Sequence, residues 1–161
     1  MYIPFNELPE TSKIWIYQSS KRFTAEQQTE ISEKLTHFLN SWSAHGTGLQ
    51  ASFEIKYERF IIIAVNQEVQ AATGCSVDDS VRFIMQLEQA YGITLMDKMN
   101  VAFKQGDFVN YKDLAEFKKM AKSGAVGKKT TVFNNLVVNI ADYKENWEVP
   151  AQDSWHSRFF K

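Results

Sequence analysis

Hydrophobic residues near the start of the chain form first a strand-like run and then a helix-like stripe. Residues 14–17 are apolar and aromatic and end at two serines, which predicts a strand. Across residues 24–42 apolar side chains recur at helical spacing, and Thr24 with Gln27 forms the capping box that begins a helix. Gly46 follows, and glycine commonly ends a helix. The apolar stripe consists of Ile31, Leu35, Phe38, Leu39 and Trp42.

The middle of the chain contains its longest apolar run. Residues from about 50 to 57 alternate moderately and predict a second strand, and residues 60–65 are continuously apolar and β-branched, which predicts a buried third strand. A second helix is predicted to begin at Ser76 as its N-cap, with Asp79 three residues later, and to end near Gly92. Its buried face is expected to contain Val77, Val81, Ile84, Leu87 and Tyr91.

The order of these elements predicts the fold class. Residues 101–103 predict a fourth strand, so the chain reads strand, helix, strand, strand, helix, strand. This βαββαβ order is that of the ferredoxin-like α+β fold. We therefore predict a single domain over residues 1–161, with a core at about 12–104 and a C-terminal extension at about 105–161. The extension is predicted to contain helices at 113–122 and 140–147 and strands at 132–133 and 136–138.

Composition and charge narrow the classes of function. The chain has 161 residues and a formal net charge of −1, so no overall field attracts nucleic acid or acidic membranes. Its one cysteine, Cys75, cannot form an internal disulfide, and the first residues lack the pattern of a signal peptide. No apolar run is long enough to span a membrane. We expect a cytoplasmic protein that contacts neither membranes nor nucleic acid.

The predicted topology brings two chemically unusual segments together. In a split βαβ fold the first and second strands run parallel, so the end of the first helix lies beside the beginning of the second. Trp42 and His45 occupy the first of these ends, and Cys75 occupies the second. The N–H groups at a helix N-terminus lower the pKa of a nearby thiol, and an imidazole can accept its proton. Cys75 is therefore a candidate catalytic thiolate with His45 as its base.

Two other interpretations of the same edge stay open. A lone cysteine is most often a small buried apolar residue, and a histidine after a helix often only caps it. The helix N-terminus is also a candidate ligand site, in which Ser76, Asp78 and Trp42 would line the binding surface. The carboxylate of Asp78 opposes both a thiolate and a bound anion.

A third unusual segment lies at residues 154–159. Exposed aromatic residues are costly, so Trp155 and its neighbours are expected to dock on the domain. The alternative is that His156 and Arg158 complete a pocket, with His156 as a second candidate base and Trp155 and Arg158 as ligand-binding residues. We expect no metal and no cofactor, since no Cys/His metal spacing is present.

One glycine-rich segment has the composition of a phosphate-binding loop but not its pattern. In residues 124–130, Lys122 stands where the first glycine is required and Lys129 where a serine or threonine is required. After the apolar run at 60–65, Asn66 stands where the metal-binding aspartate of a nucleotide hydrolase would be. We therefore do not expect nucleotide hydrolysis.

Several segments give the chain a resemblance to a known group. They are residues 14–19, 42–46, 74–78, 132–137 and 154–156. Through them the chain resembles a family of uncharacterised small bacterial proteins that often carry the label "ABC transporter ATPase". The resemblance implies a bacterial protein and supplies no established catalytic residues.

The sequence therefore predicts a function only at the level of class. We expect a non-enzymatic domain that binds an unidentified small molecule or a protein, and the alternative is a thiol-dependent enzyme that uses Cys75 with His45 or His156. If the strand at about 50–57 forms the edge of the sheet, it offers a surface for pairing with itself, which would produce a homo-oligomer.

Overall fold

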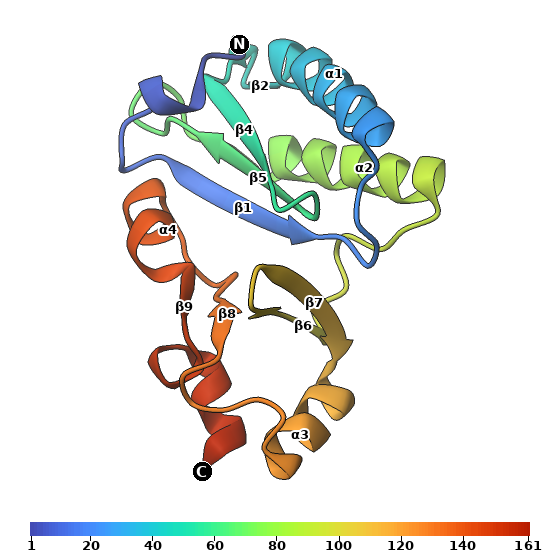
Figure 1. The fold of residues 1–161 in the computed structure, drawn as a ribbon. Coiled ribbons are helices and arrows are strands. Elements are labelled where there is room, and N and C mark those ends of the chain that lie inside the picture. Colours follow the sequence, from blue (N-terminus) through green and yellow to red (C-terminus); the bar gives the residue numbers. More distant parts are fainter. The chain divides into compact units, whose positions relative to one another are not determined.

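The computed structural model describes all residues, 1–161, and the chain divides into two compact units. The first unit contains residues 1–96 and 138–141, and the second contains residues 97–137 and 142–161. Four α-helices, three 3-10 helices and three antiparallel sheets make up the chain (Figure 1), which confirms the α+β class. The predicted boundary between core and extension was about residue 104, and the boundary between the units falls after Met96.

The first unit is built around a three-stranded sheet. Its strands are β1 (Lys13–Gln18), β5 (Phe60–Val65) and β4 (Ala51–Lys56), in the order β1-β5-β4. The central strand β5 is antiparallel to both neighbours, so β1 and β4 run in the same direction, as predicted. All six residues of β5 are buried, which confirms the interpretation of its continuous apolar run.

Helices α1 (Ala25–Ser41) and α2 (Gly74–Tyr91) pack on one face of this sheet (Figure 1). Alternate residues of β5 point toward them, because side chains along a strand alternate between its two faces. The resulting core contains Ile31, Leu35 and Leu39 of α1, Ile61, Ile63 and Val65 of β5, and Ile84 and Leu87 of α2. The stripe predicted for α1 is therefore confirmed. In α2, Ile84 and Leu87 are buried as predicted, whereas Val77 and Val81 are only partly buried and do not belong to this core.

The starts of the two helices differ in how well the sequence predicted them. At α1 the capping box of Thr24 and Gln27 is present. At α2 the prediction of Ser76 as N-cap is wrong, because Thr73 is the N-cap and Ser76 is the third residue of the helix. The Thr73 hydroxyl accepts the Ser76 N–H, and the Ser76 hydroxyl accepts the Thr73 N–H, so the two residues satisfy each other.

The prediction of a complete ferredoxin-like sheet is wrong in its fourth strand. Residues 101–103 lie in β6 (Asn100–Gln105), which pairs with strands of a separate sheet in the second unit. On the outer edge of β1, the Ile14 N–H instead donates to the Val138 carbonyl at 3.1 Å, and Lys13 forms a bridge with Asn139. A short segment from much later in the chain therefore occupies part of this edge.

The second unit contains a four-stranded antiparallel sheet. Its order is β7-β6-β8-β9, with β7 at Phe108–Asp113, β8 at Thr131–Phe133 and β9 at Glu148–Pro150. Helix α3 (Leu114–Ser123) lies where a helix was predicted at 113–122, and it begins after Asp113, whose carboxylate accepts the Glu116 N–H. The remaining elements are α4 (Ile140–Asn146), η2 (Ala151–Asp153) and η3 (Trp155–Phe160).

The strand predicted at residues 136–138 is not formed. The Asn134 side chain accepts the Leu136 N–H at 3.1 Å, which bends the chain in the manner of an Asx turn. The apolar residues of this segment therefore do not extend the sheet, although their composition favours a strand.

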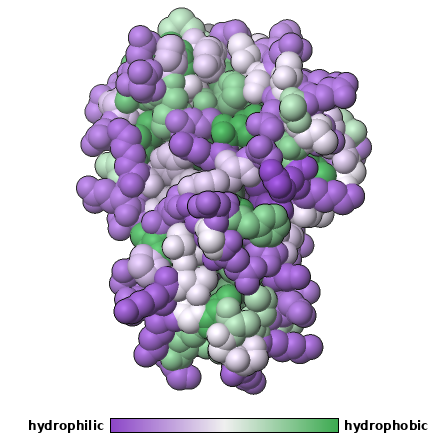
Figure 2. Space-filling view, viewed as in Figure 1, coloured by the Kyte–Doolittle hydropathy of each residue, from purple (hydrophilic) through white to green (hydrophobic).

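The surface features described so far do not point to a particular function. No helix combines the length and the apolar character that crossing a membrane requires. On the face seen in Figure 2, hydrophilic residues dominate and apolar residues form small separate groups.

Candidate functional site

The end of α1 lies beside the start of α2, as the topology predicted, and Trp42 fixes the two together. The Trp42 indole N–H donates to the Ser76 carbonyl at 2.8 Å, and this hydrogen bond is buried. The Trp42 ring also contacts Phe38 and Trp15, with ring centroids 5.3 and 6.2 Å apart. Trp42 is thus part of the core, and its side chain is not available to a ligand.

A small hairpin follows Trp42 and places His45 at its tip. Strands β2 (Ser43–Ala44) and β3 (Thr47–Gly48) pair with each other, and His45 and Gly46 form the two-residue turn. Both residues have positive φ, at 52° and 76°, which is the backbone conformation that the tightest hairpin turns require. The His45 side chain is exposed.

Cys75 is exposed in the first turn of α2. No hydrogen bond joins it to His45, so the structure brings their segments together without forming a thiol–imidazole pair. Ser76 is buried within the capping box, and Asp78 is exposed. Of the five residues predicted at this edge, Cys75, His45 and Asp78 are accessible, whereas Ser76 and Trp42 serve the packing of the helix ends.

His156, the other candidate base, lies in the second unit and is only 1% exposed. Its Nδ1 atom lies 2.6 Å from the Ser154 hydroxyl oxygen, and its ring stacks on Trp155 with centroids 3.8 Å apart. Burial, reinforced by the nearby positive charge of Arg158, lowers the pKa of His156 to about 4. The imidazole is therefore neutral at physiological pH and belongs to a packed interior.

The C-terminal segment docks on the second unit, which confirms the docking interpretation. The rings of Phe159 and Phe160 meet Phe117 of α3 edge-on, with centroids 5.4 and 6.3 Å apart. The Arg158 guanidinium lies over the Trp155 ring at 5.0 Å. Trp155 and Arg158 thus contact each other, and His156 belongs to a different unit from Cys75 and His45.

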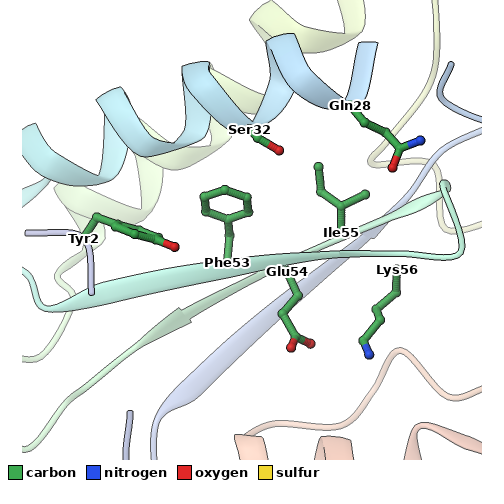
Figure 3. A pocket seen from close by; sticks show the side chains of 7 residues that line it. All are labelled: Tyr2, Gln28, Ser32, Phe53, Glu54, Ile55 and Lys56. Atoms are coloured by element: carbon green, nitrogen blue, oxygen red, sulfur yellow. The ribbon is translucent and has the colours of Figure 1, made fainter. Parts of the chain in front are cut away.

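The structure contains a pocket that the sequence did not predict, with a volume of about 400 Å³ (Figure 3). It lies in the first unit, along the outer edge of β4 and beside α1. Phe53 and Ile55 point toward α1, whereas Glu54 and Lys56 point to the opposite side of the strand (Figure 3). The lining residues are Tyr2, Gln28, Ser32, Phe53, Glu54, Ile55 and Lys56. Because residues from both faces of β4 line it, the pocket wraps around the strand edge.

The backbone of β4 is open along this pocket. The Ala51 N–H donates to the Met1 carbonyl, and its carbonyl accepts the Ile3 N–H, so both groups point away from β5. Successive residues of a strand point their backbone groups to opposite sides. The N–H and carbonyl groups of Phe53 and Ile55 therefore also point outward, where no partner meets them.

The N-terminal segment covers only the first part of this edge. Tyr2 pairs with Ala51 in a parallel bridge, and its ring contacts Phe53 with centroids 5.7 Å apart. The pairing ends after Ile3, because the chain then turns into the 3-10 helix η1 (Phe5–Glu7), with Pro4 as its N-cap. The alternating pattern at residues 50–57 predicted a strand and left open whether it forms the sheet edge, and the role of Tyr2 depends on a distant part of the chain.

Comparison with protein-family models, with curated proteins and with solved structures finds no match. The resemblance to the small bacterial family therefore stays a prediction. No group of three or more His, Cys, Asp or Glu side chains is placed to hold a metal ion.

Proposed function

We propose that this chain is a protein-interaction domain that binds an extended peptide segment as an added strand along β4. The observation that carries the proposal is the row of outward N–H and carbonyl groups of Phe53 and Ile55, which lie beside a pocket and have no partner. An extended peptide satisfies such groups through its own backbone, as in other domains that bind by strand addition. Four backbone hydrogen bonds are available at these two residues.

The pocket provides a place for the side chains of the added strand. Alternate side chains of a bound peptide would point toward α1, where the apolar rings and methyl groups of Tyr2, Phe53 and Ile55 are half-buried. Gln28 and Ser32 add hydrogen-bonding groups on the α1 side (Figure 3). Backbone pairing supplies affinity in this mode and the pocket supplies selectivity.

The test is a selection of peptides from a random display library on the purified wild-type chain. Two variants of Ile55 serve as a matched pair: Ile55→Thr keeps the backbone N–H, whereas Ile55→Pro removes it. Edge strands tolerate proline, so both variants are expected to fold, and circular dichroism checks this. Selected peptides should bind wild type and Ile55→Thr and lose binding to Ile55→Pro.

Amide hydrogen exchange locates the bound peptide. The amides of Phe53 and Ile55 should exchange readily in the free chain and become protected when a selected peptide is added. Peptides that bind Ile55→Pro as well as wild type, or that leave both amides unprotected, would contradict the proposal.

The exposure of Cys75 in the first turn of α2 favours a second candidate, a thiol-dependent enzyme. Helix α2 also contacts β2, which leads to the hairpin tip that carries His45. In this candidate His45 accepts the thiol proton when the two segments approach. The initial rate of alkylation by iodoacetamide at neutral pH should then be lower in His45→Gln than in wild type. Equal rates would leave Cys75 as an ordinary surface thiol.

A further inference from the structure

The open edge of β4 carries a charge pattern that complements itself. The acidic residue Glu54 precedes Ile55 and the basic residue Lys56 follows it. The side chains of Glu54 and Lys56 point to the same face of the strand (Figure 3). We infer that the strand received by β4 is β4 of a second copy of this chain, paired antiparallel about a two-fold axis at Ile55. This inference rests on the proposed function, because it identifies the partner at the same edge.

The backbone geometry fits such a pair. Ile55 directs both its N–H and its carbonyl outward, so two facing copies of Ile55 exchange two hydrogen bonds. A two-fold interface is self-complementary and closes after two chains, which prevents further growth along the edge. The pairing joins the two three-stranded sheets into one six-stranded sheet.

The charges select this register. With Ile55 facing Ile55, each Glu54 lies opposite Lys56 of the second copy, in a pair without backbone hydrogen bonds, where side chains approach most closely. Shifting the axis to Glu54 would place the two Glu54 carboxylates opposite each other, which is destabilising. Shifting the axis to Phe53 would place Ala51 opposite Ile55 of the second copy. The N–H and carbonyl of Ala51 are already paired with Met1 and Ile3, so they could not form that pair.

The short length of the open edge limits the strength of the pair. Only the segment from Phe53 to Lys56 is available, so few residues of each copy take part in the contact. We therefore expect a monomer–dimer equilibrium that depends on concentration and weakens with added salt, since salt screens exposed ion pairs.

The experiment measures the dimerisation constant by sedimentation velocity over a concentration series up to about 1 mM. Glu54→Lys and Lys56→Glu each place like charges opposite each other, and each should weaken dimerisation roughly tenfold. The double variant Glu54→Lys/Lys56→Glu exchanges the two charges and should restore the wild-type constant. Circular dichroism and thermal melting establish that all three variants fold.

Glu54→Gln tests the register itself. It removes the attraction to Lys56 and should weaken the dimer if Ile55 lies on the axis, whereas it would strengthen a dimer centred on Glu54 by removing a repulsion. In the wild-type chain the Ile55 amide should gain protection from exchange as the concentration rises.

The outcomes separate this inference from the proposed function. A wild-type chain that stays monomeric throughout the series overturns the second copy as the occupant, and so does a dimer that ignores all charge variants or grows stronger in Glu54→Gln. If the display library nevertheless yields peptides that need the Ile55 N–H, the proposed function stands with another protein as the partner. A monomer with no such peptides removes both.

Discussion

The edge strands β4 and β7 of the two units differ in whether their outward backbone N–H groups have hydrogen-bond partners. In the first unit, β4 leaves the backbone groups of Phe53 and Ile55 without partners beside a pocket. In the second unit, the edge strand β7 has its Tyr111 N–H bonded to the side chain of Asn110 at 2.8 Å. Proteins commonly blunt exposed strand edges because open ones pair with other chains. An edge left open over a pocket is therefore the feature that deserves a functional explanation.

The same contrast appears in the aromatic residues of the two units. In the second unit, the C-terminal segment fills the core around Phe117. In the first unit, Phe53 lies half-buried at the open edge, where Tyr2 is its aromatic neighbour. Phe117 lies in a packed interior, whereas Phe53 is partly buried at a strand edge, and the following experiment tests that distinction.

The largest expected effect is on the stability of the second unit. Phe117 is fully buried and contacts Phe103, Phe159 and Phe160, so Phe117→Ala should lower the free energy of unfolding by about 3–5 kcal/mol. Phe53→Ala should cost about 1–2 kcal/mol, because a half-buried side chain loses less buried area. Urea denaturation of both variants measures the difference. Equal losses would mean that Phe53 is a core residue and that its edge is not open.

How far the sequence predicted these features depends on how local each one is. The capping box of Thr24 and Gln27 and the buried strand at 60–65 were predicted correctly, because each depends on neighbouring residues. At the second helix, Thr73 and Ser76 are both good capping residues, and only the reciprocal bonds between them decide which one begins the helix. The periodic pattern could not make that choice.

The wrong prediction of the fourth strand has a different cause. Residues 101–103 have the composition of a strand and do form one, but composition does not specify which strand will pair with it. The hairpin through Gly106 pairs β6 with β7 locally, and this short connection competes with a distant place beside β1.

The sequence predicted the meeting of the two helix ends but not the pocket at β4. Trp42 and Cys75 were expected at neighbouring helix ends, and the Trp42–Ser76 hydrogen bond confirms that these ends meet. The pocket at β4 requires Tyr2 to return from the start of the chain, and no periodicity signals such a contact.

The second prediction concerns pH and compares the histidines of the two units. The pKa of His156 is lowered from 6.5 to about 4 in the folded chain, so the unfolded chain binds the proton more readily between these values. The free energy of unfolding should therefore fall as the pH is lowered from about 6.5 to about 4. The contribution of His156 to this fall is on the order of 3 kcal/mol. Urea denaturation from pH 7 to pH 4 measures this for wild type and His156→Gln.

The difference between the two curves isolates His156, because the carboxylates contribute equally to both. His45→Gln, at the exposed hairpin tip, serves as the control and should follow the wild-type curve. A wild-type curve parallel to that of His156→Gln would show that His156 is not buried in neutral form.

A third, smaller effect is the difference in stability loss between substitutions of Trp42 and Trp155. Trp42→Phe keeps an aromatic ring but removes the indole N–H that donates to the buried Ser76 carbonyl, and should cost about 1–2 kcal/mol. Trp155 donates no hydrogen bond through its indole, so Trp155→Phe should cost less than about 1 kcal/mol. Thermal melting of the two variants gives the comparison. A Trp42→Phe variant as stable as wild type would mean that the junction of the helix ends does not depend on the Trp42 indole N–H.

The smallest expected effect concerns one backbone N–H at the edge of β7. Asn110→Ala removes the side-chain oxygen that accepts the Tyr111 N–H, and because the residue lies at the surface of an edge strand, the change in stability should stay within about 1 kcal/mol. The Tyr111 amide should nevertheless exchange several-fold faster, toward the rates of the Phe53 and Ile55 amides. Asn110→Asp is the matched control, since its carboxylate still accepts the hydrogen bond. If the Tyr111 amide exchanged as slowly in Asn110→Ala as in wild type, the Asn110 side chain would not be what protects this N–H, and the contrast between β7 and β4 would lose its physical basis.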